Sequence, residues 1–437
     1  MRMRMRRGVV MVSLFFFAAS CVFIEAAAKK VKVKEERIQQ LDLEPGHFAG
    51  LEFMGGLILH AKDDHFGGWS GIVTKREGRE VVAVSDKGYW LNMTLSYAEG
   101  GRAPMEVTGA WTYPLLDPEG NPLKKKAWAD AESVVFGSRG DLLVSFERNH
   151  RIVRYDNVTA PATTDSALTL ASEILSKHCN YNGGPEAIET YEDHLIMFCE
   201  DAIDGYDTSF QGWLVPLQPA PGAREKSELG YSRRLFMKIT DGFRPTDFAM
   251  LDSGDLLILE RMHDGHRTGF RLEVIPRKYL AATGEEALVV PARAAEAWQS
   301  PSNPVDNMEC LSVDQLEGGK VRVNLMSDDN FSSKQQTVFF VFEVHAEDLV
   351  EYAYEMARVE DFPPSNPQVL SNGTREKTIQ VVVGVSLFLG GLLTGAGVVM
   401  IVNYVRSKNS NKRKYESFVA MTRQDFNDFS LPSDDQM

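Results

Sequence analysis

Short apolar runs, separated by turns, recur through the middle of the chain in one plan. Each of five segments opens with a polar or acidic residue, continues as an apolar run, turns, and closes a second apolar run with a carboxylate. The segments are 70–86, 132–147, 186–200, 247–260 and 309–328, and their first residues lie 62, 54, 61 and 62 residues apart. The runs are rich in Val, Ile, Leu and Phe and the turns in Gly, Asp and Ser, so each segment is predicted to be a β-hairpin.

Further strand-like runs follow most of the hairpins, at residues 150–155, 212–217, 271–275 and 337–344. Several strands in each repeated unit predict an all-β fold, a β-propeller with four-stranded blades around a central channel. Residues 51–60 supply strands before the first repeat, which could combine with the C-terminal strands to close the ring. The pattern favours six blades, with five as the alternative.

The repeat predicts where its acidic residues lie in the fold. In a hairpin the start of one strand lies beside the end of its partner, so the opening and closing residues are expected around one mouth of the channel. The opening residues are Glu132, Glu186, Asp247 and Glu309, and the closing residues are Asp86, Glu147, Glu200, Glu260 and Asp328. Carboxylates held this close cannot all stay ionised unless cations offset their repulsion. Oxygen ligands in this number suit Ca²⁺, or Mg²⁺ with waters; the alternative is that these acids are solvated loop residues or brace the turns.

The charge of the chain is unevenly distributed. It has 47 Lys and Arg against 61 Asp and Glu, a formal net charge of −14. A chain this acidic is a poor candidate for sequence-independent nucleic-acid binding, which depends on neutralising phosphates with Lys and Arg. Residues 1–28 carry +3 and the tail from residue 406 carries +1, which leaves −18 on residues 29–380. The part of the chain that holds the repeat is therefore the acidic part.

The two ends of the chain predict its compartment. A basic start, an apolar run at residues 8–24 and small residues at 26–28 are typical of a secretory signal over residues 1–28, with an N-terminal anchor as the alternative. Residues 381–403 carry no charge and are long enough to cross a bilayer, and basic residues crowd after them. The positive-inside rule then predicts a single-pass type I membrane protein, with residues 29–380 extracellular or luminal and a cytoplasmic tail at 404–437.

Smaller signals fit this arrangement. The exported part divides into an N-terminal segment at 29–47, the propeller at 48–345 and a juxtamembrane stalk at 346–380. Tyr415 to Phe418 looks like a tyrosine-based signal that a sorting adaptor could bind. Cys179 and Cys199 form the predicted disulfide, which leaves Cys310 free or intermolecular. Four N-glycosylation sequons fall on the exported side, at Asn92, Asn157, Asn330 and Asn372.

Nine short motifs occur in a distinctive order and spacing. They are Phe66-Gly-Gly-Trp-Ser-Gly71, Val84-Ser-Asp-Lys-Gly88, Trp128-Ala-Asp-Ala-Glu132, Val144-Ser-Phe-Glu-Arg148, Asn182-Gly-Gly-Pro-Glu186, Phe243-Arg-Pro-Thr-Asp247, Leu259-Glu-Arg261, Asp306-Asn-Met-Glu309 and Met326-Ser-Asp-Asp-Asn-Phe331. Over residues 48–345 they resemble the phytase-like family, described as "esterase-like activity of phytase" proteins. The resemblance implies a propeller with many Asp and Glu residues and a phosphoesterase-type activity. The sequence departs from the family pattern at Lys87, Pro185, Met308 and Cys310.

The resemblance implies a phosphate-ester small molecule as the substrate. Bound Ca²⁺ would bridge carboxylates and phosphoryl oxygens and activate a water for attack. The catalytic candidates are Glu132, Glu147, Glu186, Glu260, Arg148 and Arg261. The substrate-binding candidates are Arg244, Lys87 and His150, and the candidate metal ligands are Asp86, Asp247, Glu309 and Asp328. The alternative for each arginine is an ion pair with a neighbouring acid, and for the histidine a structural role.

Other chemistries find no motif in the sequence. It contains no Gly-x-Ser-x-Gly elbow, P-loop, His-Glu-x-x-His or Cys-x-x-Cys, which argues against triad hydrolysis, nucleotide, zinc and thiol-redox chemistry. The rival hypothesis is a non-catalytic propeller ectodomain, a receptor or adhesion module that binds an unknown ligand at the mouth.

Overall fold

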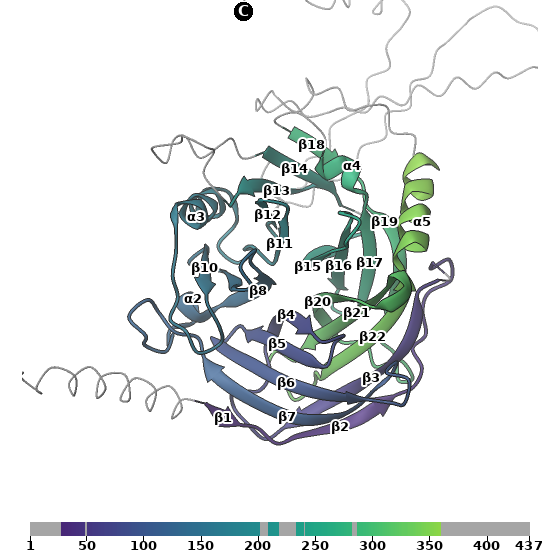
Figure 1. Ribbon diagram of the computed structural model, residues 1–437, viewed down its shortest axis with the longest axis horizontal. Helices are drawn as coiled ribbons and strands as arrows, with labels where there is room; N and C mark the ends of the chain where they lie inside the picture. Colours follow the sequence, from purple (N-terminus) through teal and green to yellow (C-terminus); the bar gives the residue numbers. More distant parts are fainter. Residues whose placement is uncertain are drawn as a thin grey trace, which may run out of the picture. The chain divides into compact units, whose positions relative to one another are not determined.

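Five β-sheets stand around a common axis (Figure 1), so the chain is an all-β, five-bladed propeller. The computed structural model describes residues 28–48, 50–201, 209–217, 233–239, 241–281 and 286–359. The innermost strand of each blade contacts the innermost strands of the blades on either side, which closes the ring around the axis.

The blades follow one another along the chain. Blade 1 consists of β4 (Trp69–Lys75), β5 (Glu80–Ser85), β6 (Tyr89–Tyr97), β7 (Pro104–Pro114) and β1 (Lys29–Lys30). Blade 2 consists of β8 (Ala131–Phe136), β9 (Leu142–Phe146) and β10 (Arg151–Tyr155), and helix α3 (Ser166–His178) packs outside β10. Blade 3 consists of β11 (Ala187–Tyr191), β12 (His194–Phe198), β13 (Ser209–Pro216), β14 (Arg233–Lys238) and the parallel β18 (Glu286–Val289).

Blade 4 consists of β15 (Arg244–Met250), β16 (Leu256–His263), β17 (Thr268–Ile275) and β19 (Ala292–Trp298). Blade 5 consists of β20 (Asn307–Gln315), β21 (Lys320–Asp328), β22 (Thr337–His345), β3 (Glu52–Ala61) and β2 (Val33–Ile38). The short helical segments are α2 (Lys126–Ala129), α4 (Arg277–Leu280) and η2 (Glu317–Gly319), and α5 (Ala346–Val359) packs on β19 and β22.

The sequence correctly predicted the five hairpins, which are the first two strands of the five blades. The predicted closure of the ring is also confirmed, because β3 pairs with β22 from the other end of the sequence. The preference for six blades was wrong. The strand over residues 52–61 does not start a blade of its own but completes blade 5, and β1 and β2 extend blades 1 and 5.

Five apolar clusters hold the propeller together, one between each pair of neighbouring blades. Between blades 4 and 5, for example, Leu259 and Leu272 pack in the same cluster as Leu325 and Phe340. Burying each such side chain stabilises the fold by about 1.5–3 kcal/mol. The innermost strands are covered on both faces, so nearly all of their residues are buried, polar ones included.

Four of the five innermost strands carry a β-bulge near the same end. The extra residue is Ser70 in β4, Glu132 in β8, Thr246 in β15 and Glu309 in β20. Bulges re-aim side chains and are common beside functional sites. In blade 3 the corresponding residue, Glu186, stands immediately before β11.

The prediction of a single-pass membrane protein is contradicted by the helices that the structure describes, none of which is both long and apolar enough to cross a membrane. The predicted span at 381–403 lies outside the described residues. So do residues 1–27 of the predicted signal, the tail with Tyr415 to Phe418, and the sequon at Asn372.

Candidate functional site

One mouth of the channel is surrounded by residues at or near the ends of the second strands. The backbone N–H of Asp86 donates to the Gly68 carbonyl at 2.9 Å. In the same way, Glu147 donates to Asp130 at 2.8 Å and Glu200 to Gly184 at 3.0 Å. The same position is held by Asp328 in blade 5, which pairs with Asn307, and by Arg261 in blade 4, which pairs with Arg244. Four blades therefore present a carboxylate at this position, and blade 4 presents a guanidinium.

The bulge residues bring further carboxylates to the same mouth. Glu132, Glu186 and Glu309 belong to blades 2, 3 and 5, and each is 6% exposed. Burial is the largest cause of the raised pKa of Glu132, and the charges of Glu186 and Glu309 raise it further. The predicted gathering of opening and closing acids at one mouth therefore holds for most of the set.

Asp247 is an exception to the predicted equivalence. It pairs with Leu259 one residue beyond the bulge, so its counterpart in blade 2 is Ser133 and not Glu132. Its carboxylate accepts hydrogen bonds from Ser133 Oγ at 3.0 Å and from the backbone N–H of Leu311 at 2.8 Å. Asp247 therefore braces three innermost strands inside the propeller, which does not support its predicted role as a metal ligand at the mouth.

Glu260 is the second exception. It pairs with Pro245, and the residue that reaches the mouth in blade 4 is the next one, Arg261. The Glu260 side chain is fully buried and has no hydrogen-bond partner among the described residues. Burial, followed by the charge of Glu273, raises its pKa well above the ordinary value. The one-residue difference in register turns Glu260 away from the mouth, which does not support its predicted catalytic role.

Three carboxylates in blade 2 lie close enough to share one metal ion. Asp130, Glu132 and Glu147 each offer an oxygen, and these oxygens all lie within 4.8 Å of one another. Burial, followed by the charge of Asp130, raises the pKa of Glu147 to about 7. A donor set made only of buried carboxylates fits a hard cation such as Ca²⁺ or Mg²⁺.

The negative charges of Glu132 and of its neighbour Glu186 in blade 3 are the least neutralised by other side chains at the mouth. Neither carboxylate forms a hydrogen bond or an ion pair among the described residues, although both are more than nine-tenths buried. Burial raises the pKa of each well above the ordinary value. Among the neighbouring charges, Glu186 raises the pKa of Glu132 most, and Glu200 raises the pKa of Glu186 most. This side of the mouth has the charge of a site for an added cation.

Backbone geometry keeps Glu147 in this position. A Cβ at Gly184 would come within 2.6 Å of Glu147 Cγ, so only glycine leaves room for the carboxylate. The predicted disulfide between Cys179 and Cys199 is present, and it ties the end of α3 to the residue before Glu200. Cys310 is a buried free thiol that donates to the carbonyl of Trp69 at 3.2 Å.

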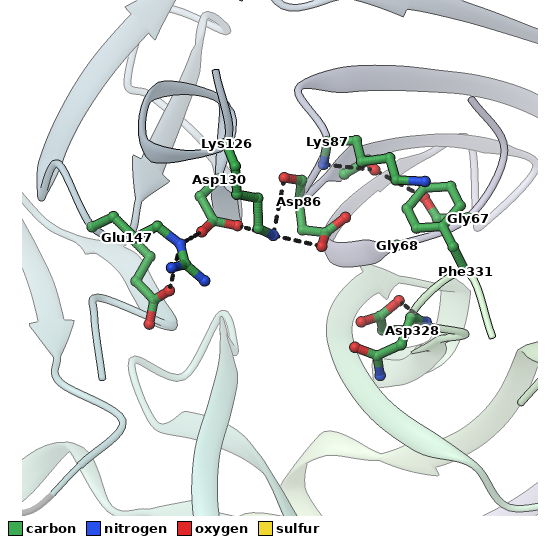
Figure 2. A network of polar contacts seen from close by, with 12 residues as sticks. Gly67, Gly68, Asp86, Lys87, Lys126, Asp130, Glu147, Asp328 and Phe331 are labelled. Atoms are coloured by element: carbon green, nitrogen blue, oxygen red, sulfur yellow. Dashed lines mark hydrogen bonds and ion pairs between the residues drawn. The ribbon is translucent and has the colours of Figure 1, made fainter. Parts of the chain in front are cut away.

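A chain of ion pairs crosses from blade 2 to blade 1 (Figure 2). Arg148 pairs with Asp130 and lies 3.7 Å from Glu147 Oε2. Lys126 of α2 pairs with the other Asp130 oxygen and, at 2.7 Å, with Asp86 Oδ2. Both oxygens of Asp130 therefore already face cationic side chains of the protein.

Arg261 neutralises the opposite side of the mouth. Its Nη2 lies 3.0 Å from Glu200 Oε1, its Nε lies 3.2 Å from Glu309 Oε1, and its Nη1 donates to Asn307 Oδ1 at 3.2 Å. Burial raises the pKa of Glu309 to about 7, and the charge of Arg261 limits this rise. The ion-pair alternative that the sequence left open for the arginines is thus the arrangement of Arg148 and Arg261, and also of Arg244.

The three predicted substrate-binding residues differ in their surroundings. Arg244 is half exposed at the mouth and pairs with Asp201 Oδ1 at 2.8 Å. The Lys87 ammonium lies 3.0 Å from the centre of the Phe331 ring (Figure 2). His150 is buried and its Nε2 contacts the Asn180 carbonyl at 2.9 Å, and burial lowers its pKa, which fits the structural alternative.

The sequons within the described residues lie on different surfaces. Asn157 is exposed, and its Oδ1 accepts from the Thr159 hydroxyl at 2.7 Å. Asn330 is also exposed, and its backbone N–H donates to Asp328 Oδ1 at 2.6 Å beside the mouth. Asn92 is partly buried within β6.

Two residues of the site were missed in the sequence, Asp130 and Lys126. Asp130 stands in the motif that ends at Glu132, so the motif itself was the available signal. Lys126 stands in a run of three lysines, and nothing in the sequence distinguishes it from Lys124 and Lys125.

Comparisons with known proteins identify the family. No curated protein matches the chain. Similar solved structures include a thermostable family-43 glycoside hydrolase, at 10% identity and a TM-score of 0.35 over 63% of this chain and 89% of the other. A gluconolactonase from Xanthomonas campestris has 13% identity and a TM-score of 0.33, over 72% of this chain and 99% of the other. Likenesses this distant say nothing about activity.

A family model described as "Phytase-like: Esterase-like activity of phytase" matches residues 64–331. This range contains all five mouth positions, from Asp86 to Asp328. It covers more than half of the chain, and the chain therefore belongs to the phytase-like family.

Proposed function

We propose that this protein is a divalent-cation-dependent phosphoric ester hydrolase that acts at the carboxylate-lined mouth of the propeller. The observation that carries the proposal is the pair Glu132 and Glu186. Both carboxylates are buried at the mouth without a partner among the described residues, beside Asp130 and Glu147. Such a group needs an added positive charge or protons to be stable at neutral pH.

The chemistry of each side chain at the mouth indicates its role in this hydrolase. Asp130, Glu132 and Glu147 would hold the cation, with Glu186 as a further ligand from blade 3. A bound Ca²⁺ or Mg²⁺ would neutralise phosphoryl charge and activate the attacking water. Arg244 is exposed enough to contact a phosphoryl oxygen, and a guanidinium suits that contact. With its pKa at about 7, Glu309 is able to accept or donate a proton at neutral pH.

Membership of the phytase-like family supports a propeller with hydrolase-like or binding activity. The choice of a phosphate ester as the substrate rests on the family description together with the carboxylate site.

One observation favours a second candidate, a non-catalytic propeller that binds a ligand at this mouth. Arg148 and Arg261 are both held in ion pairs, and Lys126 is paired with two carboxylates. Cationic groups that are committed in this way are less available to stabilise charge that develops on a phosphoryl group.

Assays of the purified full-length chain with phosphate mono- and diesters separate the two candidates. Turnover is measured with Ca²⁺ or Mg²⁺ and with a chelator, in the wild type, Glu132→Gln and Glu260→Gln. The hydrolase proposal expects turnover that needs the cation, falls about 100-fold in Glu132→Gln, and persists in Glu260→Gln, whose site lies away from the mouth.

Binding of the esters without turnover would support the non-catalytic candidate. Equal turnover with and without chelator would contradict the dependence on a cation. Melting curves of each variant show whether a lost activity reflects lost folding.

A further inference from the structure

Three consecutive lysines precede the acidic strand of blade 2, but only the third contacts the mouth. Lys124, Lys125 and Lys126 are all exposed to solvent. The side chains of Lys124 and Lys125 form no ion pair among the described residues, whereas Lys126 pairs with two carboxylates. Three neighbouring residues of equal charge thus differ in whether they pair with the carboxylates of the mouth.

The Lys126 ammonium lies where oxygen ligands from two blades converge (Figure 2). Its Nζ donates to Asp86 Oδ2 at 2.7 Å and to the Asp86 carbonyl oxygen at 3.3 Å, and it pairs with Asp130 Oδ1. Three oxygens around one positive charge resemble the surroundings of a bound cation. The side chain is 46% exposed, so it has an open path away from the carboxylates.

Asp130 belongs to two sets of contacts. It is held by Lys126 through one oxygen and by Arg148 through the other, and it is one of the three carboxylates whose oxygens lie within 4.8 Å of one another. An ion bound by Asp130, Glu132 and Glu147 would lie close to the Lys126 ammonium, and the two positive charges would repel each other. A divalent cation and Lys126 therefore compete for the same carboxylate.

We propose that Lys126 is a built-in competitor that sets the affinity of the mouth for divalent cations. This inference rests on the proposed cation site. Without a divalent cation, the ammonium neutralises Asp86 and Asp130. When a cation binds, Lys126 releases Asp130 and its side chain moves toward solvent. Lys126 is a positioning residue in this scheme and not a ligand.

Calorimetric titration of the full-length chain with Ca²⁺, and separately with Mg²⁺, tests the proposal. The variants are Lys126→Met and Lys125→Met. Each removes one positive charge, but only Lys126→Met also removes the ion pairs with Asp86 and Asp130. Removing a positive charge a few ångströms from the ion is expected to raise the affinity about tenfold in Lys126→Met. Lys125→Met is expected to change it less than about twofold, because its charge is exposed and screened.

A second measurement follows Lys126 itself. Amine-reactive labelling read by mass spectrometry reports how accessible each lysine is. Saturating Ca²⁺ is expected to increase labelling of Lys126 in the wild type and to leave Lys124 and Lys125 unchanged. A purely structural Lys126 would not respond to the cation.

The outcomes separate this inference from the proposed function. If the wild type binds a cation, and Lys126→Met binds it equally or more weakly, the competitor role is overturned while the cation site stands. If neither chain binds a divalent cation, both the site and the competitor role are overturned. If Lys126→Met, but not Lys125→Met, binds the cation more tightly than the wild type, and labelling of Lys126 in the wild type depends on the cation, both the cation site and the competitor role are supported.

Discussion

Blades 2 and 4 differ at the mouth although they are built on the same hairpin. At the bulge, blade 2 has Glu132 and blade 4 has Thr246. At the end of the second strand, blade 2 has Glu147 and blade 4 has Arg261. One side of the mouth therefore holds an acid without a partner among the described residues, Glu132, and the other supplies a guanidinium that already pairs with Glu200 and Glu309.

This difference shows how one scaffold divides a site into two halves. The half near blade 4 is neutralised from within, because Arg261 brings charge to the acids of blades 3 and 5. The half at blade 2 receives partial compensation, from Lys126 and Arg148 on Asp130 and from Arg148 at 3.7 Å on Glu147, and none on Glu132. A divalent cation is therefore expected at blade 2 and not at blade 4.

The largest expected effect comes from removing the internal charge of blade 4. Arg261→Met leaves buried Glu309 without a cationic partner and Glu200 with only the 3.7 Å pair to Arg244, and breaking a buried ion pair in this way costs about 3 kcal/mol. Urea unfolding at neutral pH measures the change. The matched control is Arg244→Met, whose half-exposed pair with Asp201 is expected to contribute less than about 1 kcal/mol. Equal losses in the two variants would contradict the internal neutralisation of this half.

A smaller effect is expected from the buried acids behind Arg261. Burial raises the pKa of Glu273 to about 7, although the charges of Arg271 and Arg293 oppose the rise. Because the folded state holds this proton more tightly than the unfolded state, the contribution is full at low pH and is lost as the pH rises to about 7. Glu273→Gln removes this dependence.

Urea unfolding at pH 5 and pH 8 checks this prediction. The wild type is expected to lose on the order of 2 kcal/mol more than Glu273→Gln between the two pH values. The same slope in both proteins would show that Glu273 ionises normally inside blade 4.

The smallest effect concerns Lys87, next to the acid half. Its ammonium lies over the Phe331 ring, and an exposed cation–π contact contributes about 0.5–1 kcal/mol. Lys87→Met is expected to lose this amount in urea unfolding and to change the KM for a phosphate ester less than about twofold. A tenfold higher KM would show that Lys87 binds the substrate, as the sequence motif suggested.

The sequence predicts the repeat well because the apolar runs mark strands that are buried on both faces. It overestimates the blade number because a strand at 52–61 looks the same whether it starts a blade or completes one. The pairing of this strand with β22, from the other end of the sequence, decides which of the two it does, and the hydropathy pattern contains no information about that pairing.

The site residues show a similar limit. Glu132, Glu147, Glu186 and Glu309 were predictable from their phase in the repeat. Asp247 and Glu260 were misplaced because each lies one residue from the equivalent position in blade 4, where Thr246 is the bulge residue and Arg261 reaches the mouth, and a shift of one residue turns a side chain to the other face. Lys126 was not predictable, because only the fold distinguishes it from the adjacent lysines.

The most direct test of the central claim is the position of a bound ion. Crystals of the full-length chain grown with Mn²⁺ allow the metal to be located by its anomalous scattering. The account predicts a peak within about 2.1–2.6 Å of oxygens of Asp130, Glu132 and Glu147, and none at Arg261 or Glu260 in blade 4. A mouth without a peak at a saturating concentration of the ion, or a peak only elsewhere, would contradict it.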